Sequence, residues 1–239
     1  MPIEGSKITP NQQQGRSVRV NRQRRSRRRN GGDSVGKYFG DAWSLAKRTA
    51  YGLNEIRKLI NIEEKELVTN GVSAPFDTNG ALVPISRIAQ GSNYTDRIGN
   101  SIKMQHIEVR GRIFKNSSAT YSVMRVLLVR DLDGYGTVPN IPDIMETVGT
   151  TLAPLTQYDF LNRKRFSILY DELLTLNNTG DSSAVFEIQL PHEGHILYLG
   201  STAAAASDGK GSLYMLFISD ESTNTPTYAF SSRIVFTDD

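Results

Sequence analysis

The chain of 239 residues contains no cysteine, a single tryptophan and only three histidines. Without cysteine there is no disulfide framework, no thiol nucleophile and no zinc site built on thiolates. No stretch of eighteen consecutive apolar residues occurs, which argues against a transmembrane helix. The first ten residues lack an apolar core, so we expect no secretory signal.

Motifs for catalysis or metal binding are also scarce. The sequence has no G-x-S-x-G elbow, P-loop, H-E-x-x-H pair or dinucleotide fingerprint, and we therefore expect the protein not to be an enzyme. His192-Glu193-Gly194-His195 has the composition of a metal pair, but Pro191 and Gly194 favour a hairpin turn with surface histidines. Asp131-Leu132-Asp133-Gly134 lacks the later acids of an EF-hand loop and favours a turn after a strand.

The positive charge is concentrated at one end of the chain. Residues 1–37 carry a net charge of +8, whereas residues 38–239 carry −5. Residues 1–33 are rich in Gln, Asn, Ser and Gly and poor in large apolar side chains, which predicts a disordered arm. Arginine stays charged at biological pH and pairs with phosphate through a planar fork. The arm is therefore predicted to bind a nucleic-acid backbone without reading its sequence, and a nuclear localisation signal is a compatible alternative. The candidate residues are Arg16, Arg19, Arg22, Arg24, Arg25, Arg27, Arg28 and Arg29.

An amphipathic helix is predicted over residues 34–66. Its apolar residues, from Val35 to Ile60, recur at steps of three, four or seven, which matches one face of a helix. Lys47 and Lys58 are eleven residues apart and lie close to one face, so they extend the positive charge of the arm. We divide the chain into an arm (1–33), a helix with its linker (34–70) and a body (71–239).

The body is predicted to be all-β. Short runs of Val, Ile, Leu, Tyr and Phe alternate with clusters of Gly, Asn, Asp, Ser and Pro, which favours an antiparallel sandwich or barrel. A longer excursion, from Gly134 to Asn162, interrupts this rhythm. The eight candidate strands are Leu82–Gln90, Ile102–Lys115, Tyr121–Arg130, Arg165–Leu176, Ala184–Leu190, His195–Gly200, Ser212–Ser219 and Tyr228–Thr237.

Several motifs occur in a recognisable order along the body: Ile88-Ala89-Gln90-Gly91, then Asp96-Arg97-Ile98-Gly99, then the runs 124–131, 164–171 and 213–220. This ordered set, behind an Arg-rich arm and a helix, resembles the single jelly-roll capsid proteins of satellite tobacco necrosis virus and of circular Rep-encoding single-stranded DNA viruses. The resemblance implies an eight-stranded antiparallel jelly roll that assembles into an icosahedral shell of sixty copies. It also implies a packaged single-stranded DNA or RNA genome and a location in the virion, with a nuclear stage if the genome is DNA.

The same resemblance implies further site residues. Lys103, Arg130 and Lys164 match inward-facing basic positions and are expected to contact nucleic acid. Some family members bind calcium between subunits, and Glu63 and Asp238 match two of the acids concerned. A second family calcium position is Ser92 in this chain, which is a departure from the acidic pattern.

Two other classes of protein remain open on the sequence alone. A cellular β-sandwich with a basic tail would bind nucleic acid through the arm but form only a small oligomer. A jelly-roll enzyme or sugar-binding module of the cupin type would need a His-x-His pair followed by a glutamate, which the sequence does not contain.

Overall fold

A computed structural model of the chain describes residues 44, 45, 47, 49, 63–147 and 153–238. The chain forms two units, Met1–Ile60 and Asn61–Asp239. In the first unit the four described residues are helical, and the hydroxyl of Thr49 donates to the carbonyl of Leu45 at 2.9 Å, as expected one helical turn away. The predicted arm with its eight arginines, most of the predicted helix and Lys58 lie outside the described residues.

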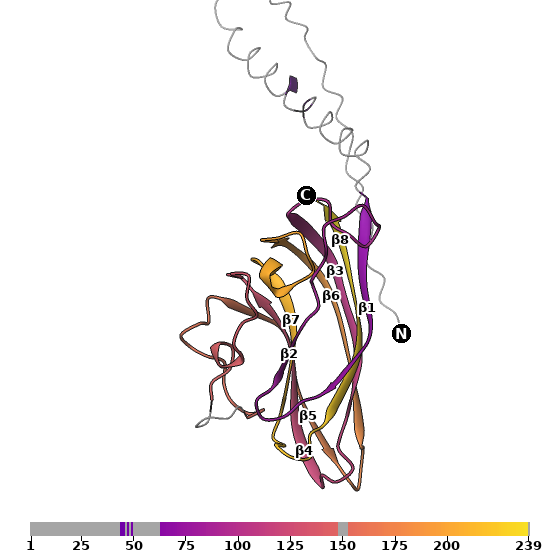
Figure 1. The fold of residues 1–239 in the computed structure, drawn as a ribbon, viewed down its shortest axis with the longest axis vertical. Helices are drawn as coiled ribbons and strands as arrows, with labels where there is room; N and C mark the ends of the chain where they lie inside the picture. Colours follow the sequence, from indigo (N-terminus) through magenta and orange to yellow (C-terminus); the bar gives the residue numbers. More distant parts are fainter. Residues whose placement is uncertain (1–43, 46, 48, 50–62, 148–152, 239) are drawn as a thin grey trace, which may run out of the picture. The chain divides into compact units, whose positions relative to one another are not determined.

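The second unit consists of two four-stranded antiparallel sheets packed face to face (Figure 1). One sheet has the order β1-β8-β3-β6 and the other the order β2-β7-β4-β5. The strands are β1 (Glu64–Pro75), β2 (Ala81–Pro84), β3 (Ser101–Phe114), β4 (Tyr121–Asp131), β5 (Phe166–Asn177), β6 (Ser183–Leu197), β7 (Ser212–Ser219) and β8 (Thr227–Asp238).

The order of the strands defines a jelly roll. Every connection except the one from β4 to β5 crosses from one sheet to the other, and the first and last strands, β1 and β8, are neighbours. This arrangement is the double-sheet jelly roll of antiparallel all-β proteins. The predicted fold class is confirmed.

The main core lies between the two sheets and follows from alternation along the strands. On β3 the side chains of Ile107, Val109 and Ile113 are fully buried, whereas Arg110 and Arg112 between them are exposed. Aromatic rings fill the centre, where Phe217 of β7 stacks on Tyr228 of β8 with 4.2 Å between ring centroids.

The first strand was not predicted. Residues 64–70, which the sequence analysis assigned to the helix and linker, form the first half of β1 and belong to the jelly roll. The sequence hides this strand because its pattern is mixed: Val68 is exposed, Lys65 is buried, and the inward apolar side chains of Leu67, Val72 and Ala74 are only partly buried. A register shift between Thr69 and Val72 further disturbs its alternation.

The predicted hairpin turn at residues 191–194 is wrong. Pro191 and Gly194 lie inside a single long strand, β6, which replaces the two predicted strands Ala184–Leu190 and His195–Gly200. The pairing of β6 with β3 shifts register here. Met104 lies opposite Gly194 and His106 opposite Pro191, so that β6 has one residue more than β3 between these two pairs. Because β6 is an edge strand, a proline costs it less than it would cost a central strand.

The long connection between β4 and β5, residues 132–165, covers the outer face of the β2-β7-β4-β5 sheet. It contains a short 3-10 helix, η1 (Ile141–Asp143), and lies to the left of the sheets in Figure 1. Ile144 and Met145 of this connection are buried against Leu127 and Val129, the outward side chains of β4. The connection therefore gives the body a second, smaller hydrophobic core.

Candidate functional site

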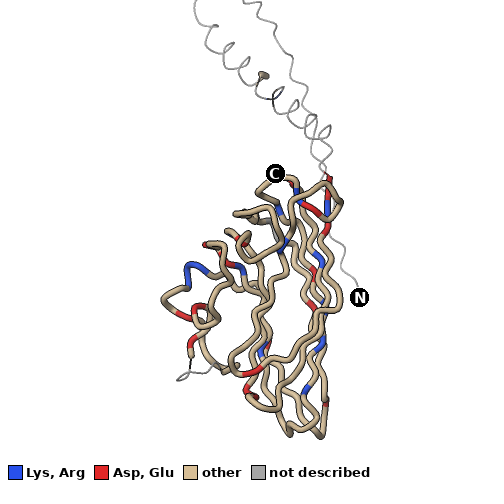
Figure 2. The backbone as a smooth tube through the Cα atoms, viewed as in Figure 1, with Lys and Arg blue, Asp and Glu red and all other residues tan. Residues whose placement is uncertain are grey.

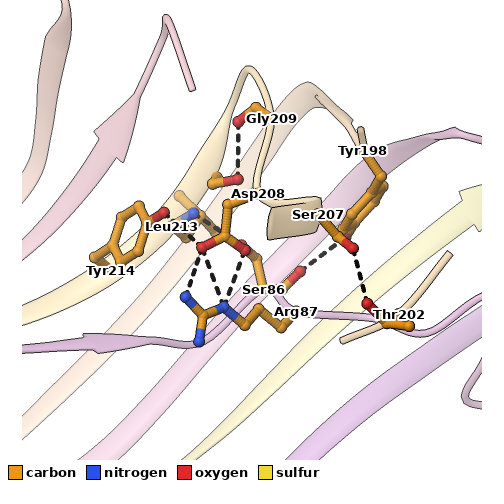
Figure 3. A network of polar contacts seen from close by, with 10 residues as sticks. Ser86, Arg87, Tyr198, Thr202, Ser207, Asp208, Gly209, Leu213 and Tyr214 are labelled. Carbon is orange, nitrogen blue, oxygen red and sulfur yellow. Dashed lines mark hydrogen bonds and ion pairs between the residues drawn. The ribbon is translucent and has the colours of Figure 1, made fainter. Parts of the chain in front are cut away.

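Two long connections, residues 85–100 and 198–211, meet at one end of the sandwich, and the amide of Gly136 in the β4–β5 connection donates to the carbonyl of Asp208 there. The buried carboxylate of Asp208 joins these two connections (Figure 3). It accepts hydrogen bonds from Arg87, with 2.7 Å from Nη2 to Oδ2, and from the hydroxyl of Tyr214 at 2.9 Å. The hydrogen bonds to Asp208 raise the pKa of Arg87, and burial raises the pKa of Tyr214. The network thus links the loop that carries Arg87 to the one that carries Asp208 through hydrogen bonds.

A second buried cation, Arg97, holds the same loops from the other side. Its side chain has no exposed surface and donates to the carbonyls of Ile88, Gly99 and Gly200. Its guanidinium lies 4.2 Å from the ring centroid of Tyr198, and burial lowers its pKa. Because Arg97 is enclosed by backbone oxygens, it is a structural residue and does not reach a ligand in solvent.

The third connection is anchored by Asp131, at the end of β4. This carboxylate is fully buried and accepts from Arg165 twice, at 3.0 Å from Nε and 2.8 Å from Nη2. The Arg165 guanidinium also lies 5.6 Å from the ring of Tyr135 and 4.8 Å from that of Phe166. Its hydrogen bonds to Asp131 raise the pKa of Arg165. The ion pair thus ties the end of the long connection to the sheet beneath it.

Arg130, one of the predicted nucleic-acid contacts, extends between the two sheets. Its Nη2 donates to the carbonyl of His195 at 3.0 Å, and burial lowers its pKa. Gly194 makes this possible, since a Cβ there would lie 2.7 Å from the guanidinium nitrogen Nη1. The structure therefore places Arg130 against the backbone of β6.

The other predicted basic residues are spread over the molecule. Lys103 is half-buried on β3 and pairs in register with His195, so that Lys103 and Arg130 share this neighbour. Lys164 is exposed on the β4–β5 connection, where Figure 2 shows a basic stretch. Lys47 is exposed on the helix of the first unit.

The predicted calcium residues occur where β1 begins and β8 ends. Glu63 is exposed. Asp238 is engaged within the chain, because its Oδ2 lies 2.9 Å from Nζ of the buried Lys65 and its Oδ1 accepts from the amide of Ile98 at 2.9 Å. In the part of the chain that the structure describes, no three His, Asp or Glu side chains gather closely enough to hold a metal ion. The described residues of one chain therefore do not assemble a set of oxygen ligands for calcium.

The outer face of the β1-β8-β3-β6 sheet is charged but internally balanced. Arg110 contacts Glu108 at 2.8 Å and Glu187 at 3.0 Å. Arg233 lies 3.4 Å from Glu66 and 3.9 Å from Glu108. These two arginines thus face carboxylates on their own or a neighbouring strand, whereas Arg112, exposed on the same face, lies 5.7 Å from the ring of Phe114.

Sequence comparison gives the class of the protein. An eight-stranded jelly roll behind a basic segment is an architecture of viral coat proteins. The sequence profile of the satellite tobacco necrosis virus coat protein matches residues 47–239, and the chain belongs to this family. The match includes the whole jelly roll and extends into the helical residues before it. The predicted resemblance to this virus family is confirmed.

Individual relatives are viral coat proteins. The capsid protein of Satellite tobacco necrosis virus 1 is 29% identical over 181 residues, which are 73% of this chain and 88% of that protein. The coat protein of Satellite tobacco necrosis virus 2 is 26% identical over 77% of this chain and 92% of its own length. That of Maize white line mosaic Satellite virus is 24% identical over 63% and 69%. These relatives support a capsid function.

Among the described residues, no helix is long and apolar enough to cross a bilayer. Lys164 was predicted as a nucleic-acid contact, whereas its neighbours Arg163 and Arg165 were not. Together they form the only run of three consecutive basic residues between positions 38 and 239, which was a signal available in the sequence.

Proposed function

We propose that this chain is the coat subunit of a small icosahedral particle in which sixty copies enclose a single-stranded nucleic-acid genome. The observation that carries the proposal is the family match across residues 47–239, which coincides with a complete jelly roll. Coat proteins of this kind form closed shells by repeating the same contacts under point-group symmetry. The virion is the corresponding location.

The charge distribution supports different roles for the two parts of the chain: the arm binds the genome and the body forms the shell. Sixty arms with a net charge of +8 bring about 480 positive charges into the particle, enough to neutralise a large part of a genome of one or two thousand nucleotides. The body, with a net charge of −5, forms the wall. The eight arm arginines with Lys47 and Lys58 are the main genome contacts in this proposal, and Lys103, Arg130 and Lys164 add to them. If the genome is DNA, the arm also serves as a nuclear localisation signal.

The assembly part of the proposal is tested with the purified full-length protein. Electron microscopy and analytical ultracentrifugation are expected to show uniform closed particles. A monomer or a small discrete oligomer at every protein and salt concentration would contradict the shell and support the cellular nucleic-acid-binding alternative. Digestion of the released contents with deoxyribonuclease and ribonuclease then identifies the genome type.

The packaging part is tested by changing the arm alone. A variant with the eight arginines replaced by glutamine is expected to lose most of the packaged nucleic acid, because backbone neutralisation depends on charge. The matched control replaces the same residues by lysine, which retains the charge and should retain most of the packaging. Normal contents in the glutamine variant, measured as the absorbance ratio at 260 and 280 nm, would show that the arm is not the packaging element.

Calcium between subunits, at Glu63 and Asp238, stays a prediction from the sequence and is not part of this proposal. Because Lys65 lies on Asp238, the ion would have to compete with an ammonium group for that carboxylate. We therefore expect the particles to stay intact when a chelator removes calcium. Dissociation of the particles once the chelator has lowered free calcium to the micromolar range would instead support a site at Glu63 and Asp238.

A further inference from the structure

We propose that residues 160–165 and Tyr135 form a stacking site for single-stranded nucleic acid on the body of the subunit. We call this set, formed by Phe160, Arg163, Lys164, Arg165 and Tyr135, the stacking segment. The proposal rests on the proposed function in taking a single-stranded nucleic acid as the ligand. Beyond the phosphate contacts already proposed for the arm and for Lys164, it adds contacts to bases on the body of the subunit.

The first observation is the state of the charges in this segment. Arg165 is neutralised by the buried Asp131. Arg163 and Lys164 are exposed, and among the described residues the structure records no ion pair for either of them. On the outer face of the β1-β8-β3-β6 sheet, by contrast, Arg110 and Arg233 contact glutamates. The stacking segment therefore presents cationic groups that phosphate can engage without first displacing a carboxylate.

The second observation is the pairing of exposed aromatic rings with these cations. Phe160 is 65% exposed, and the Arg163 guanidinium lies 3.7 Å from its ring centroid. Tyr135 is 67% exposed, with Arg165 at 5.6 Å. Each ring is thus accessible from solvent and lies beside a guanidinium group. Aromatic rings interleaved with Arg and Lys are the usual surface for single strands, where bases stack on rings and phosphates meet cations.

The third observation is that the segment is held in place before any ligand arrives. Asp159 accepts from the amide of Asn162 at 2.7 Å and from its side chain at 2.9 Å. The amide of Arg165 donates to the carbonyl of Asn162 at 2.8 Å, and the amide of Leu132 donates to that of Arg165 at 2.8 Å. Because the loop is already ordered, binding does not have to supply the entropy of ordering it.

Photochemical cross-linking of the full-length protein distinguishes this site from the arm. The protein is mixed with a single-stranded oligonucleotide carrying 5-iodouracil, irradiated and digested, and the adducts are mapped by mass spectrometry. The expected result is adducts at Phe160 and Tyr135 in addition to residues 1–37. Adducts confined to the arm would overturn the stacking site and leave the proposed function standing, whereas no adducts anywhere would count against both.

Two variants separate the contributions of ring and charge. Phe160→Leu keeps an apolar side chain but removes the ring, and is expected to abolish the adduct at 160 and weaken binding about five-fold or more. Phe114→Leu is the matched control, because Phe114 is only 41% exposed and its neighbour Arg112 lies farther from the ring, at 5.7 Å, so that its loss should weaken binding much less. Substituting Arg163 and Lys164 by glutamine should reduce the salt dependence of binding, by about 0.7 in the logarithmic slope per cation.

A contact between two copies of the chain is the competing use of this surface. Leu161, beside Phe160, is 88% exposed and would suit such a contact. If Phe160→Leu and Leu161→Ser prevent particle formation while no adduct maps to 160–165 in the parent protein, the surface joins subunits and the stacking proposal is wrong. Unchanged assembly combined with loss of the adduct supports the proposal.

Discussion

The outer faces of the two sheets differ in chemistry and in what lies over them. The face of β2-β7-β4-β5 carries apolar residues such as Leu127 and Val129, and the 132–165 connection buries them. The face of β1-β8-β3-β6 carries Glu108, Arg110 and Arg233, which pair with one another or with neighbouring carboxylates. The β4–β5 connection thus covers the apolar face of one sheet, whereas, among the described residues, the charged face of the other sheet is uncovered and forms ion pairs among its own side chains. The covering segment therefore both completes the packing of one sheet and presents its own exposed residues to solvent.

The largest expected effect comes from weakening the covered face. Ile144→Ala should destabilise the unassembled chain by about 2–4 kcal/mol, because it leaves a cavity in the second core. Chemical denaturation monitored by circular dichroism measures the change. The control is Val185→Ala on the open face, where the side chain is 64% exposed and the loss should stay below about 0.5 kcal/mol. Equal losses at the two positions would mean that the connection is not part of the folded body.

A smaller, pH-dependent effect is expected at the rim of the covered face. Arg125 binds the carboxylate of Asp171, with 2.7 Å from Nε to Oδ1, and also donates to the carbonyls of Pro154 and Thr156. These hydrogen bonds hold the pKa of Asp171 below its ordinary value and raise that of Arg125. For a depressed acid, the added stability is complete above the unfolded pKa of about 4 and is lost as pH falls through the folded value.

The measurement is the free energy of unfolding between pH 2 and pH 7 for the parent chain and for Asp171→Asn. The variant should be less stable at pH 7, and the difference should shrink as the solution is acidified. A difference that stays constant down to pH 2 would show that Asp171 acts through packing and not through its charge.

The smallest effect is expected on the open face. Glu108→Gln removes a charge that Arg110 and Arg233 both face, yet the pairs are exposed and screened by water and salt. The loss of stability should be about 0.5 kcal/mol or less, and salt should reduce it further. A loss comparable to that of Ile144→Ala would mean that the ion pairs, and not the buried core, set the stability of this sheet.

The strands that could be predicted from the sequence are those with a strong apolar pattern. β7 was predicted with its observed bounds, Ser212–Ser219, and β3 and β4 to within one residue at each end. β1 was missed because its mixed pattern of buried and exposed residues and its register shift hide its alternation. β6 was divided in two because Pro191 and Gly194 are typical of turns, and only the register shift in the partner strand β3 lets them remain in a strand.

The positive charge of the candidate site could be predicted from the sequence, but the arrangement of its side chains could not. The basic run around Lys164 is visible in the sequence, whereas the ring contacts of Phe160 and Tyr135 depend on how the connection folds. Arg97 and Arg130 illustrate the same limit, because both are cations in the sequence and both bond to backbone carbonyls in the structure. Sequence alone does not distinguish a cation that serves a ligand from one that serves the fold.

The long edge strand β6 also bears on how the subunit avoids self-association of the wrong kind. An exposed edge of fifteen residues is a template on which another chain can add a strand. Pro191, near the middle of β6, has no amide hydrogen to donate, and the register shift opposite it bends the regular ladder. Both features interrupt the regular edge and make it a poorer template for the addition of a strand from another chain.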